Sequence, residues 1–314
     1  MHGENQTAVT EFILLGLSDL PELQKVLFPL FLLCYAATLL GNLIIAIVVS
    51  IEAYLHTPMY FFLGNLSILE ILYVSVTIPS MLCNFLRDRR SISFCGCLTQ
   101  MYFFISFVVT DCFLLTSMAY DRYVAICQPL RYTIIMSRGL CNRLAVASWI
   151  LGFLKSALHT SRVSVLHFCG PYQINHFFCD FPAVLELSCS DIHLNQMLIF
   201  ILGGITGLGC FLLILVSYVR IVSTVAKLHS IAGRRKAFST CSSHLTVVML
   251  YFATLTFTYV TPTDSYTAGY NSLVAMVYSI MNPMLNPLIY SLRNKEVQTG
   301  LRRIIGGLFG GFWK

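Results

Sequence analysis

Two acidic residues lie within long apolar stretches of the chain, where a charged side chain is costly. Glu70 is in the stretch 58–82 and Asp111 is in the stretch 97–120. Carboxyl groups in such surroundings must face other polar groups rather than hydrocarbon. Two carboxyl groups that lie near each other either share a proton or bind a cation through several oxygens. The sequence therefore leaves two interpretations open, a sodium site at Glu70 and Asp111 or a hydrogen-bonded pair that holds no ion.

A basic residue and an acidic residue stand next to each other where the third apolar stretch ends. Arg122 follows Asp121 directly, and a guanidinium there must be paired or must reach the edge of the hydrocarbon. The adjacent carboxylate can neutralise Arg122 in one state and release it in another, which would make the pair a switch. The alternative interpretation is an ordinary basic residue that anchors the end of a helix at the membrane interface.

The dipeptide Asn286-Pro287 interrupts the last apolar stretch. Proline removes one backbone hydrogen bond of a helix and bends it, and Asn286 or a water molecule can satisfy the freed carbonyl. Tyr290, one turn further on, would move with that bend. Asn286, Asn42 and Ser67 are also candidate oxygen donors to a cation near the acidic pair. Because proline is tolerated in membrane helices for packing alone, a purely structural role is the alternative.

These residues require elements that hold polar groups in apolar surroundings, and the composition indicates a membrane. The chain has 314 residues, of which 57% are hydrophobic and 11% charged, whereas soluble domains have roughly 25% charged residues. Its 20 Lys and Arg and 14 Asp and Glu could not cover the surface of a soluble protein of this length. Soluble enzymes, coiled coils, disordered chains and nucleic-acid-binding domains are therefore poor fits.

The apolar stretches have the length of membrane spans, since a spanning helix needs about 20 mostly apolar residues. Such stretches occur at about 26–50, 58–82, 97–120, 142–162, 197–225, 238–260 and 270–291, which makes seven. The N-terminus does not resemble a cleaved signal peptide, because it lacks a basic region and a small-residue cleavage site. No internal repeat is visible at a fixed period, which weakens the case for a transporter built from inverted repeats.

Lysine and arginine are distributed unevenly between the two sides of these stretches. With the N-terminus outside, fourteen of the 20 basic residues lie in inner loops and the tail, five lie outside, and Lys155 lies within the fourth stretch. The positive-inside rule therefore places the N-terminus outside. The glycosylation triplet that begins at Asn5 agrees, because glycans are added only on that side. The net charge of +6 is then a bias toward the inner face and does not indicate a nucleic-acid partner.

Four strings at the ends of these stretches carry a family resemblance. They read LHTPMYFFL at 55–63, MAYDRYVAIC at 118–127, KAFSTCSSHL at 236–245 and PMLNPLIYSLRN at 283–294. Asp-Arg-Tyr and Asn-Pro-x-x-Tyr in these places resemble rhodopsin-like G-protein-coupled receptors, and the longer strings resemble the olfactory receptors specifically. The resemblance runs from about Asn5 to Arg303.

The resemblance implies a fold and a function. The fold would be an all-α membrane protein, a seven-transmembrane helix bundle with a short C-terminal interfacial helix, divided into an extracellular N-terminus (1–25), the bundle (26–292) and the cytoplasmic helix and tail (293–314). The protein would be a receptor rather than an enzyme. It would bind an odorant in the outer half of the bundle and activate a stimulatory heterotrimeric G protein, raising cAMP at the plasma membrane of olfactory cilia.

The resemblance also assigns the residues that switch the receptor. Tyr290 would pair with Tyr218, and Phe252 stands where the wider class has a tryptophan. The family's acid in the second span is usually Asp and that in the third span Glu, so the acids of the sodium site are exchanged here. The implied switch and G-protein-coupling residues are Asp121, Arg122, Tyr123, Tyr218, His244, Phe252, Asn286, Pro287 and Tyr290.

The expected ligand is a small neutral volatile. An amine receptor would carry an acid where Phe104 stands, a retinal protein would carry a lysine within 270–291, and carboxylate-binding relatives tend to carry an arginine where Thr263 stands. A mostly apolar pocket with a few polar handles suits a small neutral molecule, although packing alone would also explain each inward aromatic residue. The implied ligand-binding residues are Phe104, Ile105, Val108, His159, Phe200, Gly203, Phe257, Tyr259 and Ser279.

The remaining expectations concern modifications, partners and competing functions. The resemblance pairs Cys97 with Cys179 and Cys169 with Cys189, leaving Cys95 over. No cofactor is required, although sodium could bind at Glu70 and Asp111. The further partners are membrane lipid, through the basic face of the C-terminal helix, and a trafficking escort. A transporter or ion channel that conducts past the two acids is the competing function, but it needs more polar residues along one face than these stretches supply.

Overall fold

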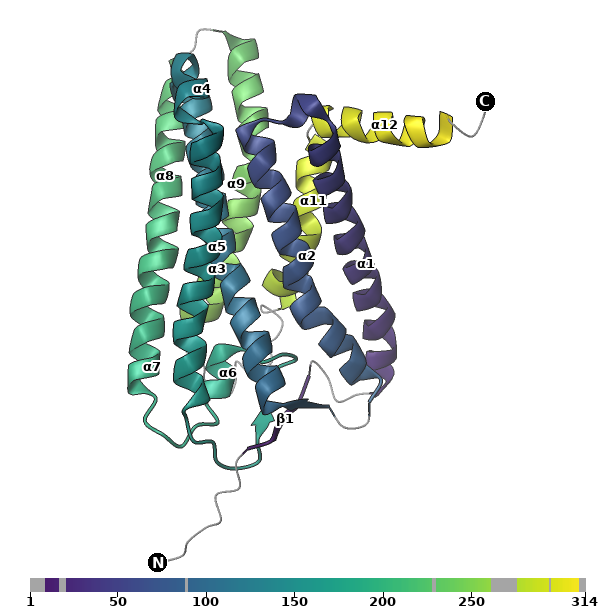
Figure 1. The fold of residues 1–314 in the computed structure, drawn as a ribbon, viewed down its shortest axis with the longest axis vertical. Helices are drawn as coiled ribbons and strands as arrows, with labels where there is room; N and C mark the ends of the chain where they lie inside the picture. Colours follow the sequence, from purple (N-terminus) through teal and green to yellow (C-terminus); the bar gives the residue numbers. More distant parts are fainter. Residues whose placement is uncertain are drawn as a thin grey trace, which may run out of the picture.

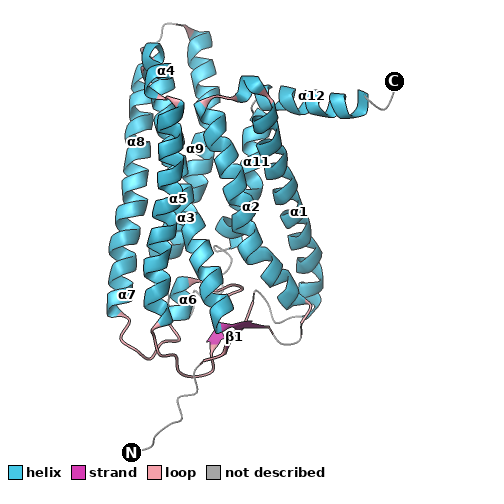
Figure 2. Ribbon diagram, in the orientation of Figure 1, coloured by secondary structure: helices cyan, strands magenta, loops and turns pink. Residues whose placement is uncertain are grey.

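The computed structural model of the chain describes residues 9–16, 21–87, 90–227, 230–260, 276–293 and 295–310. Long helices run side by side in an elongated bundle, with a small β-sheet at one end and a helix that leaves sideways at the other (Figure 1, Figure 2). We refer to these as the sheet end and the α12 end. The bundle comprises α1 (Pro21–Ile51), α2 (Pro58–Phe85), α3 (Phe94–Cys127), α5 (Arg138–Ser164), α7 (His193–Leu198) with α8 (Gly204–Ala226), α9 (Ile231–Val260) and α11 (Asn282–Arg293).

The outer surface of this bundle is apolar. Leu33 of α1, Leu154 of α5 and Leu213 of α8 each expose more than 60% of their surface. Among the described residues, four helical stretches are long and apolar enough to cross a membrane, at 22–51, 58–85, 94–127 and 193–226. Lipid on the outside removes the cost that such a surface would have in water, so the chain is a multi-pass membrane protein.

The other three bundle segments are shorter or bent. The chain over 129–135 makes an angle of 65° with α5, and together they form a fifth candidate span, while the apolar part of α9 covers 241–256. The expected last span, 270–291, begins in residues outside the described ranges and continues as the π-helical segment Val277–Met281 and then α11. The element order agrees with the predicted fold class, a seven-helix bundle with a short C-terminal helix, and the helices run side by side (Figure 1).

α3 and α5 approach each other closely because α5 carries a glycine at the contact. A Cβ atom on Gly152 would lie 2.2 Å from Thr110 Oγ1 and 2.6 Å from the Ser106 carbonyl oxygen. One turn along α5, the Ser156 hydroxyl donates to the Tyr102 carbonyl of α3. The contact therefore requires a residue without a side chain at position 152.

The sheet end is closed by the N-terminal segment and two loops. β1 (Glu11–Leu14) pairs antiparallel with β2 (Ser91–Ser93) and parallel with β3 (Gln173–Ile174). Phe12 on β1 is fully buried, and its ring lies edge-on to Phe168 with 5.4 Å between centroids. The sheet and its apolar contacts therefore fix the N-terminal strand across the end of the bundle.

Two disulfides tie the long loop before α7 to the bundle and to itself. They join Cys97 to Cys179 and Cys169 to Cys189, and Cys95 is free and exposed. The loop also contains the short helix α6 (Phe181–Leu185), whose preceding residue, Asp180, accepts a hydrogen bond from the Phe181 amide.

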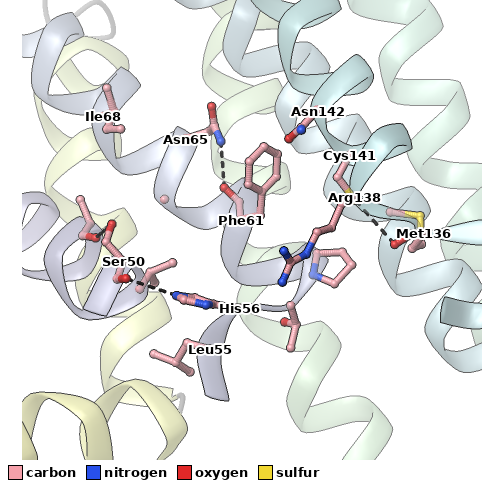
Figure 3. Close-up of a pocket in the computed structure, with 15 residues that line it drawn as sticks. Ser50, Leu55, His56, Phe61, Asn65, Ile68, Met136, Arg138, Cys141 and Asn142 are labelled. Carbon is pink, nitrogen blue, oxygen red and sulfur yellow. Dashed lines mark hydrogen bonds between the residues drawn. The ribbon is translucent and has the colours of Figure 1, made fainter. Parts of the chain in front are cut away.

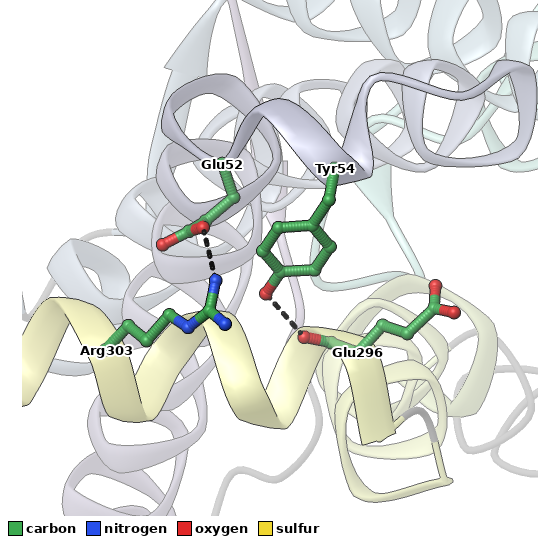
Figure 4. A network of polar contacts seen from close by, with 4 residues as sticks. All are labelled: Glu52, Tyr54, Glu296 and Arg303. Carbon is green, nitrogen blue, oxygen red and sulfur yellow. Dashed lines mark hydrogen bonds and ion pairs between the residues drawn. The ribbon is translucent and has the colours of Figure 1, made fainter.

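At the α12 end, 3-10 turns at Ala53–Leu55 and Pro129–Arg131, together with α4 (Tyr132–Ile135), connect the helices. α12 (Lys295–Gly310) leaves the bundle sideways after α11 (Figure 1). Arg303 forms an ion pair with Glu52 at 3.8 Å, and the Tyr54 hydroxyl donates to the Glu296 carbonyl at 3.0 Å (Figure 4). These contacts hold α12 against the turn between α1 and α2.

Candidate functional site

Glu70 of α2 and Asp111 of α3 are both buried in the bundle, close enough for their carboxyl groups to interact electrostatically. Asn286 of α11 donates from Nδ2 to Glu70 Oε1. Asp111 Oδ1 is buried without a hydrogen-bond partner among the described residues. An unsatisfied carboxyl oxygen beside a second acid suits a hard cation. Within the described ranges no three His, Cys, Asp or Glu side chains gather as metal ligands, so an ion here would rely on two acids and neutral oxygens.

The proline of α11 is accommodated by a donor from another helix. Pro287 lacks an N–H group and thereby frees the carbonyl four residues earlier, that of Pro283. Asn42 Nδ2 of α1 donates to that carbonyl at 3.3 Å. Gly41 makes this possible, since a Cβ there would lie 3.0 Å from Pro287 Cγ. The sequence suggested Asn286 or water for this role, but Asn286 bonds Glu70 instead.

Arg122 and Asp121 do not form an ion pair in the described part of the chain. Asp121 is buried and accepts a hydrogen bond from the Tyr132 hydroxyl at 2.8 Å from Oδ1. Arg122 Nε is buried without a hydrogen-bond partner. Its guanidinium lies close enough to Asp121, and also to Tyr218 of α8 and His244 of α9, to affect all three electrostatically.

Tyr218 and His244 form a chain of hydrogen bonds that joins three helices. His244 Nε2 lies 3.1 Å from the Leu115 carbonyl of α3, and Nδ1 lies 2.8 Å from the Tyr218 hydroxyl. A carbonyl can only accept, so Nε2 carries the proton; in the neutral ring Nδ1 then accepts from Tyr218. This chain links α3, α8 and α9 near Arg122.

Tyr290 does not have the partner that the family resemblance implies. The Tyr218 hydroxyl is directed to His244, and the Tyr290 hydroxyl is buried with no hydrogen-bond partner among the described residues. On α9, Phe252 is buried against Phe211, with 5.7 Å between the ring centroids. Its neighbour Tyr251 donates to the Val108 carbonyl of α3 at 2.6 Å. Of the other predicted switch residues, Tyr123 accepts from Gln128 Nε2 at 3.3 Å.

The half of the bundle toward the sheet end contains an aromatic cluster. Phe104 of α3 is almost fully buried between Tyr73 of α2 and Phe178 of the long loop, with ring centroids 5.2 and 4.6 Å away. His176 lies edge-on to Phe178 at 4.4 Å. Burial lowers the pKa of the His176 imidazole to about 3, so the ring is neutral at physiological pH. The loop therefore inserts an uncharged aromatic plug into the bundle.

Most of the other predicted ligand-binding residues lie around this cluster or on neighbouring helices. His159 of α5 is buried with its ring 5.5 Å from Phe181. Ser279 is fully buried, and its hydroxyl has no hydrogen-bond partner among the described residues. Ile105, Val108 and Gly203 are partly buried. Phe257 and Tyr259 are in α9, but their side chains lie outside what the structure describes, as does the whole of Asn5.

The prediction that Phe200 lines the pocket is wrong for this structure, because 82% of its side chain is exposed on the outside of the bundle. Phe200 belongs to the π-helical segment Ile199–Gly203. A π-helical turn holds more residues than an α-helical turn. The side chains in and before such a turn therefore point in other directions than they would in a regular α-helix.

Lys155 is a polar residue of the bundle to which sequence reasoning gave no role. Its ammonium donates to the Leu202 carbonyl at 3.0 Å and to Thr206 Oγ1 at 2.9 Å. Leu202 is in the π-helical segment, where the regular helix hydrogen bonds are interrupted. A lysine in the middle of an apolar span was the available signal, since such a charge must find partners inside the protein.

Apolar helices arranged around buried polar side chains, with loops joined by disulfides at one end, define a multi-pass helical membrane protein. Comparison with known proteins identifies the family. The sequence profile described as Olfactory receptor matches residues 31–307. The chain is 50% identical to Olfactory receptor 1G1 of Gorilla gorilla gorilla over 305 residues, which are 97% of each protein.

Further relatives give the same result. Olfactory receptor 5AP2 of Mus musculus is 48% identical over 97% of this chain and 96% of its own length. Olfactory receptor 1F1 of Homo sapiens is 49% identical over 98% of both chains. The chain belongs to the olfactory receptor family, whose members are receptors rather than enzymes and in general need no cofactor.

Proposed function

We propose that this odorant receptor binds a small, neutral volatile in the sheet-end half of its bundle and activates a heterotrimeric stimulatory G protein, which raises cAMP. The observation that carries the proposal is the state of Arg122. Its guanidinium forms no ion pair among the described residues, its Nε has no hydrogen-bond partner, and it lies near enough to Asp121, Tyr218 and His244 to affect them electrostatically. An outward movement of the inner ends of α8, α9 and α11 would expose it to a helix of the G protein.

The buried hydroxyl groups of Tyr218 and Tyr290 could exchange hydrogen-bond partners during such a movement. The Tyr290 hydroxyl lacks a partner in this state, which costs about 1–3 kcal/mol. If the chain from Tyr218 to His244 opened, Tyr218 could turn to Tyr290, as the family resemblance implies. Ligand binding would then shift an existing equilibrium between two arrangements of these bonds.

The ligand class follows from the side chains of the sheet-end half. Phe104 offers an apolar ring, while the Ser279 hydroxyl and the His159 imidazole offer hydrogen bonds. Such a site favours a neutral molecule held by dispersion and one or two hydrogen bonds. Phe200 is not part of it.

The remaining proposals concern orientation and surroundings. The sheet end, with the N-terminus and a glycan on Asn5, is extracellular, and the α12 end is cytoplasmic, as the excess of Lys and Arg requires. The domain limits 1–25, 26–292 and 293–314 follow from this orientation. The receptor is located in the plasma membrane of cilia, and an escort assists its trafficking. Sodium binds at Glu70 and Asp111, and α12 lies on anionic lipid.

A cell-based screen tests this function. Cells that express the chain are exposed to neutral odorants and to carboxylic acids, and cAMP is measured. We expect responses to neutral odorants, and Phe104→Ala to raise the half-maximal concentration about tenfold, equivalent to about 1.4 kcal/mol. Phe200→Ala is the matched control and should have no effect, because its ring faces outward. A response confined to carboxylic acids would contradict the neutral ligand, and an odorant-evoked current in cells without G proteins would contradict the coupling.

A further inference from the structure

A groove opens between α1, α2 and α5 at the α12 end, on the opposite half of the bundle from the proposed odorant site (Figure 3). Its volume is about 470 Å³, and it is lined by 15 residues from these helices and the turns that connect them. Ile68 on its wall is half exposed, as are Ile47 of α1 and Val146 of α5 nearby in sequence. The groove is therefore continuous with the surface that faces hydrocarbon.

The groove changes character along its length. Phe61, Gly64 and Ile68 of α2 form an apolar wall, whereas His56, Thr57 and Arg138 lie at the mouth. The eleven residues from Pro58 to Ile68 span about 15 Å along the helix. A molecule with a polar head and an apolar chain matches this arrangement, and a pocket of several hundred Å³ would hold its head and the first part of one chain.

The mouth attracts negative charge. Arg138 is exposed, and the part of the chain that the structure describes offers it no hydrogen bond or ion pair. In Figure 3 its guanidinium extends into the groove toward His56, which donates from Nε2 to the Ser50 carbonyl at 3.2 Å. None of the 15 lining residues is acidic.

Two helix ends add to this attraction. α2 begins at Pro58 and α5 begins at Arg138, so the positive ends of two long helices meet at the mouth of the groove. Ser137 caps α5 by accepting a hydrogen bond from the Leu140 amide, whereas Thr57 precedes α2 without forming a capping hydrogen bond through its side chain. Free N–H groups at a helix start, together with an arginine, are groups that bind phosphate.

We propose that the groove binds one anionic phospholipid from the leaflet at the α12 end. Its phosphate contacts Arg138 and the start of α2, and the first part of one acyl chain lies along Phe61, Gly64 and Ile68. In the orientation proposed above this leaflet is cytoplasmic, where anionic lipids are concentrated. The site is separate from the odorant site, and its occupancy does not depend on odorant binding or G-protein coupling.

Photolabelling of the full-length receptor tests the site. The receptor is placed in phosphatidylcholine nanodiscs that contain a small fraction of phosphatidylserine with a diazirine on one acyl chain, and labelled peptides are identified by mass spectrometry. We expect labels within 58–68 and 138–142. Arg138→Gln should reduce them about fivefold, since one basic residue near an anionic surface contributes about 1 kcal/mol.

Matched variants separate this groove from other basic surfaces. Arg143→Gln, on the same end of α5 with its Nε bonded to the Gly139 carbonyl, should leave the labelling unchanged. Gly64→Leu should reduce it by filling the groove, and a Cβ at Gly64 meets only Val49 Cγ1 at 3.6 Å, so the variant should fold. Equal labelling by a phosphatidylcholine probe, or labelling that Arg138→Gln does not change, would overturn the proposal.

Discussion

Asp111 has a buried carboxyl oxygen without a hydrogen-bond partner among the described residues, and the second acid, Glu70, lies close by. A buried polar atom in this condition costs about 1–3 kcal/mol. A proton on one of the acids removes the repulsion between them, whereas a sodium ion satisfies the oxygens of both. These two states have the same fold and differ in their response to salt.

We predict that sodium stabilises the receptor through these acids. The Tm of the purified protein should be higher in sodium chloride than in choline chloride, by an amount equivalent to about 1.4 kcal/mol when sodium is tenfold above its Kd. Asp111→Asn and Glu70→Gln should abolish the difference. Asp191→Asn, at an exposed loop position, is the control and should retain it. Equal Tm values of the wild type in the two salts would show that the acids form a pair without an ion.

We predict that the Tyr218–His244 chain holds the receptor in its resting state. His244→Phe and His244→Ala each remove both bonds of the ring and leave the Tyr218 hydroxyl free to turn to Tyr290. Each lost bond is worth about 1 kcal/mol, so basal cAMP should rise up to about fivefold at equal surface expression. Ser217→Ala, whose hydroxyl bonds only within α8 to Leu213, should not raise it. Unchanged basal cAMP in both variants would mean that the chain does not restrain α9.

At the scale of elements, the sequence predicts the long helices well. It predicts less well which side chains of a helix point into the bundle and which strands pair. Apolar length alone indicates α1, α2, α3 and α8, because burying backbone groups in lipid requires helices. The strands of the sheet end have two to four residues each and depend on pairing between distant segments, which no local pattern specifies. Phe200 shows the other limit, since one π-helical turn changes the direction in which a side chain points.

We predict that the long loop before α7 makes the receptor sensitive to mild acid. The pKa of His176 is lowered by burial from about 6.5 to about 3, so the unfolded chain binds more protons than the folded chain between these values. The free energy of unfolding is therefore highest above pH 6.5 and decreases as the pH falls from 6.5 toward 3. At pH 5 the decrease is about 2 kcal/mol.

The measurement is the Tm of the purified receptor between pH 7.5 and pH 5, in steps of about half a unit. His176→Phe should flatten the acid side of the curve, because it removes the titrating ring and keeps an aromatic group beside Phe178. His193→Phe, at an exposed position, is the control. A curve that is the same with and without His176 would contradict this explanation.

We predict that the contact between α3 and α5 does not tolerate a side chain at Gly152. Gly152→Val should place atoms against Thr110 Oγ1 and the Ser106 carbonyl, and it should lower stability by about 3 kcal/mol or more. Surface expression and Tm measure this loss. Gly207→Val in α8, where a Cβ would have no neighbour within 4 Å, should be well tolerated. Normal expression of Gly152→Val would show that α3 and α5 can separate.

At the scale of the whole molecule, several of the few charged residues lie at positions where they contact other helices. Two acids and an asparagine lie in the centre of the bundle, Arg122 lies near its α12 end, and Arg303 attaches α12 to Glu52. Arg122 and Asn286 lie in strings that carry the family resemblance, and Glu70 and Asp111 are recognisable in the sequence as acids inside apolar stretches. Sequence reasoning did not find the Asn42 bond to Pro283 or the Lys155 bonds to Leu202 and Thr206, since both are made between segments that are distant in sequence.

The most direct test of the proposed function is nucleotide exchange in a purified system. The receptor in nanodiscs is mixed with a stimulatory G protein, and GTPγS binding is measured with and without a neutral odorant found in the cell screen. We predict that the odorant accelerates exchange, that Arg122→Ala abolishes the acceleration while the odorant still binds, and that Arg131→Ala at the same end retains it. An odorant that binds but leaves exchange unchanged, or that drives ion flux through receptor liposomes without any G protein, would contradict the account.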